Sequence, residues 1–213
     1  MAKKDRLGKR KKRTINQREP ELGYYLIFTD TDETEKNYFD GLKESISDKY
    51  KGNLTIKVKK SGTYDLVEYC KQESSQHPQY AIPWIVLDRD EVKDFDSLLS
   101  QAIKNNINVG WSNPCIEIWF EAYFGKMPTY SNSKACCKGF ETEFKKRTGK
   151  IYEKKSKTIY SDLYNFGNEE NAIKLAKRRY NEKKSDGYTK PSSMNPCTTV
   201  YELVEEIRNK VKE

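Results

Sequence analysis

Residues 82–91 read IPWIVLDRDE, and this stretch sets the class of fold. An almost unbroken apolar run that ends in charged residues is typical of a strand buried on both faces. Pro83 lies near the start of the run, where a missing N–H is tolerated. Residues 24–28 form a second such run, which leads to Asp30 and Asp32. Strands of this kind occur in parallel sheets that helices cover on both faces.

Strand and helix patterns alternate on either side of this stretch. Strands are predicted at 54–58 and 107–111, in addition to the two apolar runs. Helical patterns lie between them, through Tyr38, Leu42 and Ile46, through 66–70 and through 95–103, and a strongly apolar helix covers 116–123. This order predicts an α/β fold with a mostly parallel sheet covered by helices. Sheets of this type place their sites beyond the carboxyl ends of the strands.

The chain divides into three parts by composition. Residues 1–20 hold nine Lys or Arg against Asp5 and Glu19, so this basic tail carries most of the net charge of +8. It is interpreted either as a solvated, disordered tail or as an arm that adds phosphate affinity. Residues 21–125 form the α/β core. Residues 126–213 are predicted to be a mainly helical extension that packs back on the core, with helices at 134–147 and 169–183 and an amphipathic helix within 195–213.

Composition excludes several classes of function. No apolar run approaches the roughly 20 residues needed to span a bilayer, so a cytoplasmic protein without a membrane partner is expected. The single histidine, His77, argues against Ser-His-Asp chemistry. Five cysteines without a CxxC pair predict reduced, packed thiols, and structural zinc is not expected.

Acids at the ends of two predicted strands suggest a metal site. Asp30 and Asp32 follow the first strand, and Asp88 and Asp90 end the third, with Arg89 expected to point away from them. Both ends open on the same edge of a parallel sheet, where such carboxylates would suit Mg²⁺ or Mn²⁺. Acids after strands also commonly cap the next helix, so each acid alone has an ordinary structural reading.

Glu117 lies within an apolar helix, where a carboxylate is costly unless it is paired or bound to metal. Rotation of the helix could equally place it on an exposed stripe.

Four blocks of sequence resemble the RloB-like family, whose members are encoded beside restriction or abortive-infection genes. The blocks are YLIF with TEKNYFDGL (25–28 and 34–42), VLDRDE (86–91), SNPCIEIW (112–119) and NPCTTV (195–200). They occur in the family's order and spacing, and the tail before Glu21 lies outside them. The resemblance implies a Toprim-like fold, divalent metal and phosphodiester chemistry in anti-phage defence, with a partner ATPase encoded nearby.

The resemblance also implies roles for single residues. Asp88 and Asp90 occupy the metal-binding DxD positions, and Asp30 stands where the family usually has a glutamate. Glu35 and Glu117 match family acids and would complete the metal shell or handle protons. The family's EGExTE turn reads DTDETE here, at 30–35, which puts full activity in question.

The resulting hypothesis is a metal-dependent nuclease that cleaves RNA, possibly tRNA, or DNA. Arg89, Asn113, Lys59 and Lys60 are the candidate contacts to nucleic acid. Two alternatives remain open: a Toprim-like module that binds nucleic acid or a partner without cutting, and a haloacid-dehalogenase-like phosphatase that uses Asp30 and Asp32. The oligomeric state does not follow from the sequence.

Overall fold

The computed structural model describes residues 23–29, 33–58, 65–77, 81–90, 92 and 94–211. The strands are β1 (Tyr24–Thr29), β2 (Leu54–Val58), β3 (Ala81–Asp88), β4 (Asn108–Asn113) and β5 (Cys197–Thr198). The helices of the first half are α1 (Thr34–Glu44), α2 (Asp48–Lys51), α3 (Leu66–Ser75), α4 (Phe95–Lys104) and α5 (Glu117–Tyr123). Those of the second half are α6 (Ser133–Thr148), α7 (Ile159–Phe166), α8 (Glu169–Ser185), the 3-10 turn η2 (Pro191–Ser193) and α9 (Val200–Val211).

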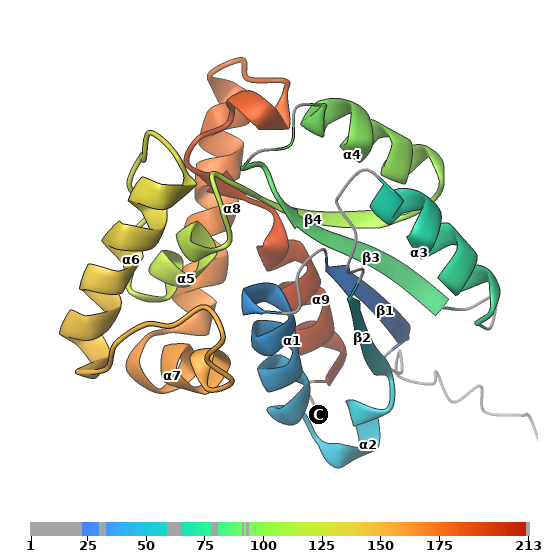
Figure 1. Ribbon diagram of the computed structural model, residues 1–213, viewed down its shortest axis with the longest axis horizontal. Helices are drawn as coiled ribbons and strands as arrows, with labels where there is room; N and C mark the ends of the chain where they lie inside the picture. The colour runs from blue at the N-terminus through green and yellow to red at the C-terminus, as the bar shows by residue number, and fades with distance from the viewer. Residues whose placement is uncertain are drawn as a thin grey trace, which may run out of the picture.

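The sheet has the order β2-β1-β3-β4-β5. The first four strands are parallel, and β5 pairs antiparallel with β4 through Ser112 and Asn113. Helices α3 and α4 cover one face of the sheet, and α1 and α9 cover the other (Figure 1). The predicted class, a mostly parallel helix-covered sheet with a mainly helical C-terminal part, is confirmed.

Each face of the sheet has its own apolar core, because consecutive strand residues point to opposite faces. In β1, Tyr25 and Ile27 pack against α1 and α9, whereas Leu26 and Phe28 pack against α3 and α4. This explains why the strand reads as a continuous apolar run. β3 pairs with β4 from Trp84 onward. Pro83 precedes this pairing, so its missing N–H does not interrupt the hydrogen bonds between the two strands.

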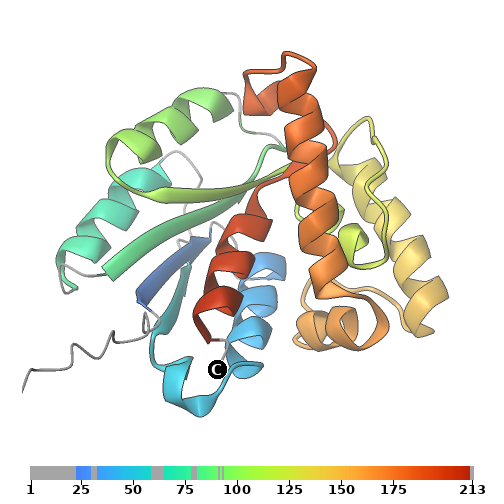
Figure 2. The same ribbon diagram turned by 180° about the vertical axis from the view of Figure 1, so that it is seen from behind.

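Helices α5, α6, α7 and α8 form a body beside the β4 end of the sheet (Figures 1 and 2). Two of these helices begin at asparagine caps, in which Asn132 accepts from Ala135 N–H at 2.9 Å and Asn168 accepts from Asn171 N–H at 2.8 Å. The predicted helices at 134–147 and 169–183 are confirmed as α6 and α8. The short helix α7 had not been predicted.

The NPCTTV block contains a strand that the sequence analysis missed. The Thr199 hydroxyl accepts from Trp111 N–H at 3.0 Å and the Thr199 N–H donates to the Trp111 carbonyl at 2.8 Å. These bonds attach the chain to β4 immediately before α9 turns back across the sheet. The boundary proposed at residue 126 remains a prediction, although β5 and α9 lie on the sheet built by the first half.

Candidate functional site at the carboxyl edge of the sheet

The end of β3 is held in place by backbone bonds to the segment that follows β4. Asp88 is the last residue of the strand. Arg89 N–H donates to the Ser112 carbonyl at 2.8 Å, and Asp90 N–H donates to the Pro114 carbonyl at 3.2 Å. The acidic turn therefore lies directly beside the SNPC segment, as expected for neighbouring parallel strands.

Asp90 does not continue the strand, which corrects the expectation that strand alternation places Asp88 and Asp90 on one side. β3 ends at Asp88, and Asp90 lies in the following turn. Its carboxylate accepts a hydrogen bond from the Ser133 hydroxyl at 2.6 Å, at the start of α6. The Arg89 guanidinium donates to the Asp90 carbonyl at 2.7 Å. Asp90 thus joins the sheet edge to the helical body.

Glu117 is buried at the first position of α5, with 1 % of its surface exposed. Its Oε1 accepts a hydrogen bond from the Tyr152 hydroxyl at 2.9 Å. One atom from each of Cys115, Glu117 and Cys137 lies within 4.8 Å of the other two. Among the described residues, this is the only group of three or more potential His, Cys, Asp or Glu ligands that lie so close together.

The two thiols are strongly held in the protonated form. The hydrogen bond with the neighbouring Cys136 and burial raise the pKa of Cys115 well above its usual range, against an opposing bond to Cys137. The hydrogen bond with Cys115, burial and the charge of Glu117 raise the pKa of Cys137. All five cysteines are free thiols, and only Cys137 is partly exposed.

The segment between α6 and α7 adds a positive charge to the same place. Desolvation opposes the charge of Lys154, but the negative charges around it, Glu117 first and Asp88 among them, outweigh this and raise its pKa. The Lys154 carbonyl accepts from the Thr34 hydroxyl at 3.4 Å. Lys155 pairs with Glu33 at 3.2 Å. The segment is therefore tied to the start of α1 and lies close to Asp88 and Glu117.

Glu35 lies in the first turn of α1 and is 4 % exposed. The chain leaves β1 at Thr29, which is in register with Val86, two residues before Asp88. Helix α1 starts at Thr34, five residues later along the chain. Asp30 and Asp32, and likewise Lys59 and Lys60, lie outside the described residues.

Asn113 has a structural environment. It is 3 % exposed, and its Nδ2 donates to the carbonyls of Pro191 and Ser192 at 3.1 and 3.0 Å. These bonds fix η2 against the sheet, so they occupy the amide that had been a candidate phosphate contact. Two basic residues of the helical body are paired with acids: Arg147 of α6 with Glu143, and Lys177 of α8 with Glu205.

Four residues of the site were missed as site residues from the sequence: Cys115, Cys137, Tyr152 and Lys154. The sequence analysis predicted Cys115 and Cys137 to be reduced thiols. They are 22 positions apart in the chain, and this spacing matches no metal-binding motif. Tyr152 and Lys154 lie in a Lys-rich segment that gives no pattern. The packing of α6 against α5 brings Cys137 to Glu117, and the segment that follows α6 brings Tyr152 and Lys154 there.

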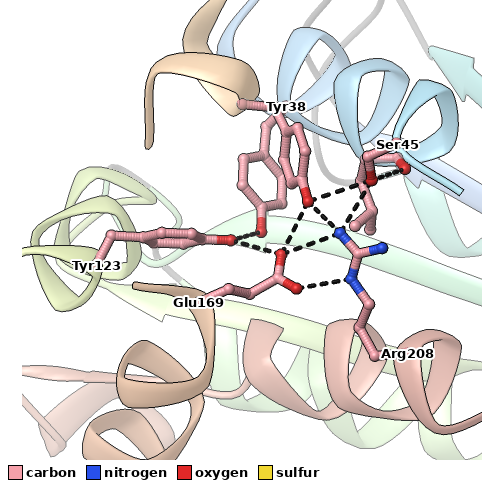
Figure 3. A network of polar contacts seen from close by, with 7 residues as sticks. Tyr38, Ser45, Tyr123, Glu169 and Arg208 are labelled. Atoms are coloured by element: carbon pink, nitrogen blue, oxygen red, sulfur yellow. Dashed lines mark hydrogen bonds and ion pairs between the residues drawn. The ribbon is translucent and has the colours of Figure 1, made fainter. Parts of the chain in front are cut away.

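A second, partly buried polar cluster joins the helical body to the core (Figure 3). Arg208 of α9 donates to Glu169 through Nε at 2.6 Å and to Ser45 Oγ through Nη2 at 2.9 Å. The Tyr123 hydroxyl donates to Glu169 at 3.1 Å and contacts the Tyr38 hydroxyl at 2.7 Å. Helices α1, α5, α8 and α9 therefore share one ion-paired network.

The fold and this edge define an α/β protein with a mostly parallel sheet whose strand ends carry carboxylates beside a thiol cluster. The model of the RloB-like protein family matches residues 25–207, so the chain belongs to the RloB-like family. No curated protein and no solved structure matches it. Within the described residues, no helix is both long and apolar enough to cross a membrane.

Proposed function

We propose that this RloB-like protein is a metal-dependent nuclease that acts on RNA or DNA in anti-phage defence, in the cytoplasm and with a partner ATPase encoded nearby. The observation that carries the proposal is the position of Asp88. It ends the central strand β3 at the edge where the parallel strands finish, and the turn after it is hydrogen-bonded to the segment that follows β4. Ligand sites of parallel sheets lie at this edge.

The residues at the edge fit a hard divalent cation. Asp88 and Asp90 supply carboxylate oxygens from one short turn, and Glu35 lies in the helix that starts at the same edge. Such ions prefer one or two carboxylates together with water and phosphate oxygens. Asp30, which directly follows Thr29, is the fourth proposed carboxylate. Mg²⁺ or Mn²⁺ bound there would polarise the phosphodiester and favour hydroxide as the nucleophile.

The chain's own groups would orient the substrate and handle protons. Glu35, buried in the first turn of α1, would accept a proton from water. Lys154 and the partly exposed Arg89 offer positive charge to a phosphate near Asp88. Glu117 lies within 4.8 Å of two thiol sulfurs and accepts a hydrogen bond from a tyrosine hydroxyl, so we leave it out of the hard-cation set.

The nuclease assay uses the full chain with labelled RNA, single-stranded DNA and double-stranded DNA, in Mn²⁺, Mg²⁺ or EDTA. Asp88→Asn and Asp90→Asn are compared with Asp186→Asn, an exposed acid after α8. We expect metal-dependent cutting that Asp88→Asn lowers by at least about 100-fold and that Asp186→Asn leaves unchanged. Urea midpoints of the variants show whether each remains folded.

The alternatives give different outcomes in the same assay. Tight binding of nucleic acid without cutting in any metal would refute the nuclease and favour a non-catalytic module. Release of phosphate from small monoesters, lost in Asp30→Asn, would instead favour the phosphatase.

A further inference from the structure

We propose that Cys115, Glu117 and Cys137 form a zinc site that is distinct from the hard-cation site of Asp88 and Asp90. The three residues come from two elements that the fold brings together: the segment from β4 into α5, and the first turns of α6. This reverses the sequence-based expectation that zinc is absent. The inference does not rest on nuclease activity, because its residues and its readout are separate.

The geometry is close to that of a loaded site. The ligand atoms lie within 4.8 Å of one another. A tetrahedral zinc ion with Zn–S near 2.3 Å and Zn–O near 2.0–2.2 Å separates its ligands by roughly 3.5–3.8 Å. Each pair of atoms therefore has to close by about 1.0–1.3 Å at most, which rotation of side chains can supply.

The chemistry of the donor set selects a softer ion than magnesium. Thiolates favour zinc, whereas Mg²⁺ is bound by oxygen ligands and water. Without metal both cysteines are thiols, so binding of the ion would release their two protons to solvent. Two thiolates and one carboxylate around a doubly charged ion leave one net negative charge. Burial opposes the charge of the nearby Lys154, but Glu117 raises its pKa, and its ammonium group would offset the charge of the site. The site would thus be electrically balanced although Cys115 and Glu117 are buried.

The groups around the ligands are those that orient a metal site. Tyr152 donates to Glu117 Oε1, which fixes the carboxylate and leaves its second oxygen for the ion. The Cys115 sulfur lies 3.8 Å from the Ser133 carbonyl oxygen. The hydroxyl of the same serine donates a hydrogen bond to the Asp90 carboxylate. Three protein ligands leave a fourth position open for water or a substrate atom, as in catalytic zinc sites.

Spectroscopic titration with Co²⁺ tests the site without any activity measurement. The full chain is reduced, stripped with chelator and titrated with Co²⁺, then with Zn²⁺. We expect one equivalent to give a thiolate-to-cobalt charge-transfer band and tetrahedral visible bands, and Zn²⁺ to abolish both. Native mass spectrometry should show one zinc ion per chain.

Matched variants assign the ligands. Cys115→Ala, Cys137→Ala and Glu117→Gln should each weaken metal binding by more than about 100-fold, and Tyr152→Phe, which removes only an orienting bond, by about 10–100-fold. Cys70→Ala is the control, because Cys70 is a buried thiol in the core on the other face of the sheet. Absence of the charge-transfer band in the wild-type chain, or its persistence in both cysteine variants, would overturn the proposal.

One measurement uses only the wild-type chain, so it does not depend on whether the variants fold. Zinc should slow alkylation of Cys115 and Cys137 in the wild-type chain relative to Cys70 and Cys197, as mapped by peptide mass spectrometry. Equal alkylation rates of Cys115 and Cys137 with and without zinc would also refute the site. Loss of nuclease activity alone would not bear on it.

Discussion

Replacing Arg208 by methionine removes the cation from the network that joins α9 to the helical body (Figure 3). The side chains of Arg208 and Glu169 are only 18 % and 10 % exposed, and two hydrogen bonds, at 2.6 and 3.3 Å, join them. Arg208 also donates to the hydroxyls of Ser45 and Tyr160. Burial opposes its charge, but hydrogen bonds to Glu169 and the charge of Glu169 raise the pKa of the guanidinium.

Arg208→Met would leave the Glu169 carboxylate buried with only tyrosine donors. Breaking a buried ion pair from one side costs about 3–5 kcal/mol, and residual exposure lowers our expectation here to about 2–4 kcal/mol. The free energy of unfolding is measured by urea denaturation. The double variant Arg208→Met/Glu169→Leu should cost less than the sum of the two single changes, by about 0.5–3 kcal/mol.

Arg147→Met provides the matched control. Arg147 makes a similar Nε bond to Glu143 at 2.8 Å, but its side chain is 45 % exposed and Glu143 keeps Lys126 as a second partner at 2.7 Å. We therefore expect a loss of about 0–1 kcal/mol. If Arg208→Met cost no more than Arg147→Met, the network would not hold the two parts of the fold together and the reasoning would fail.

Two further predictions concern single packed positions. Burial raises the pKa of Glu121, although a hydrogen bond from the Tyr130 hydroxyl opposes this shift. The stability that Glu121 contributes is therefore complete below its pKa in the unfolded chain and is lost as the pH rises through its pKa in the folded chain. Glu121→Gln should therefore gain stability relative to the wild type between pH 4 and pH 7, as read from urea midpoints; parallel pH profiles would contradict this. A Cβ on Gly41 would lie 2.4 Å from Tyr160 Cβ, so Gly41→Ala should cost about 1–3 kcal/mol, although alanine favours helix. Gly52→Ala, where a Cβ meets nothing within 4 Å, should change the unfolding free energy by less than about 0.5 kcal/mol, and equal losses at both glycines would refute the packing argument.

The proposals have separate experimental consequences. The nuclease proposal fails if Asp88→Asn cuts as fast as the wild type. The zinc proposal fails if cobalt gives no thiolate band, whatever the nuclease assay shows.

The sequence by itself determined the class of fold and placed Asp88 at the end of the third strand. Short apolar runs that end in charged residues favour strands buried on both faces, and the run at 82–91 together with the alternation around it was enough to predict β1 to β4 in order. The acids at the end of the third strand followed from the same local pattern, because the end of an apolar run marks the end of a buried strand. Four motif blocks were enough to indicate the family.

Only the tertiary structure decided which side chains meet. Cys137 reaches Glu117 because α6 packs on α5, and Thr198 becomes a strand residue because β4 leaves an edge for it. Asn113 holds η2, a segment 78 residues away in the chain. Local periodicity reports the environment of a residue within its own element, whereas these contacts depend on how separate elements pack, and no pattern within a single element records that.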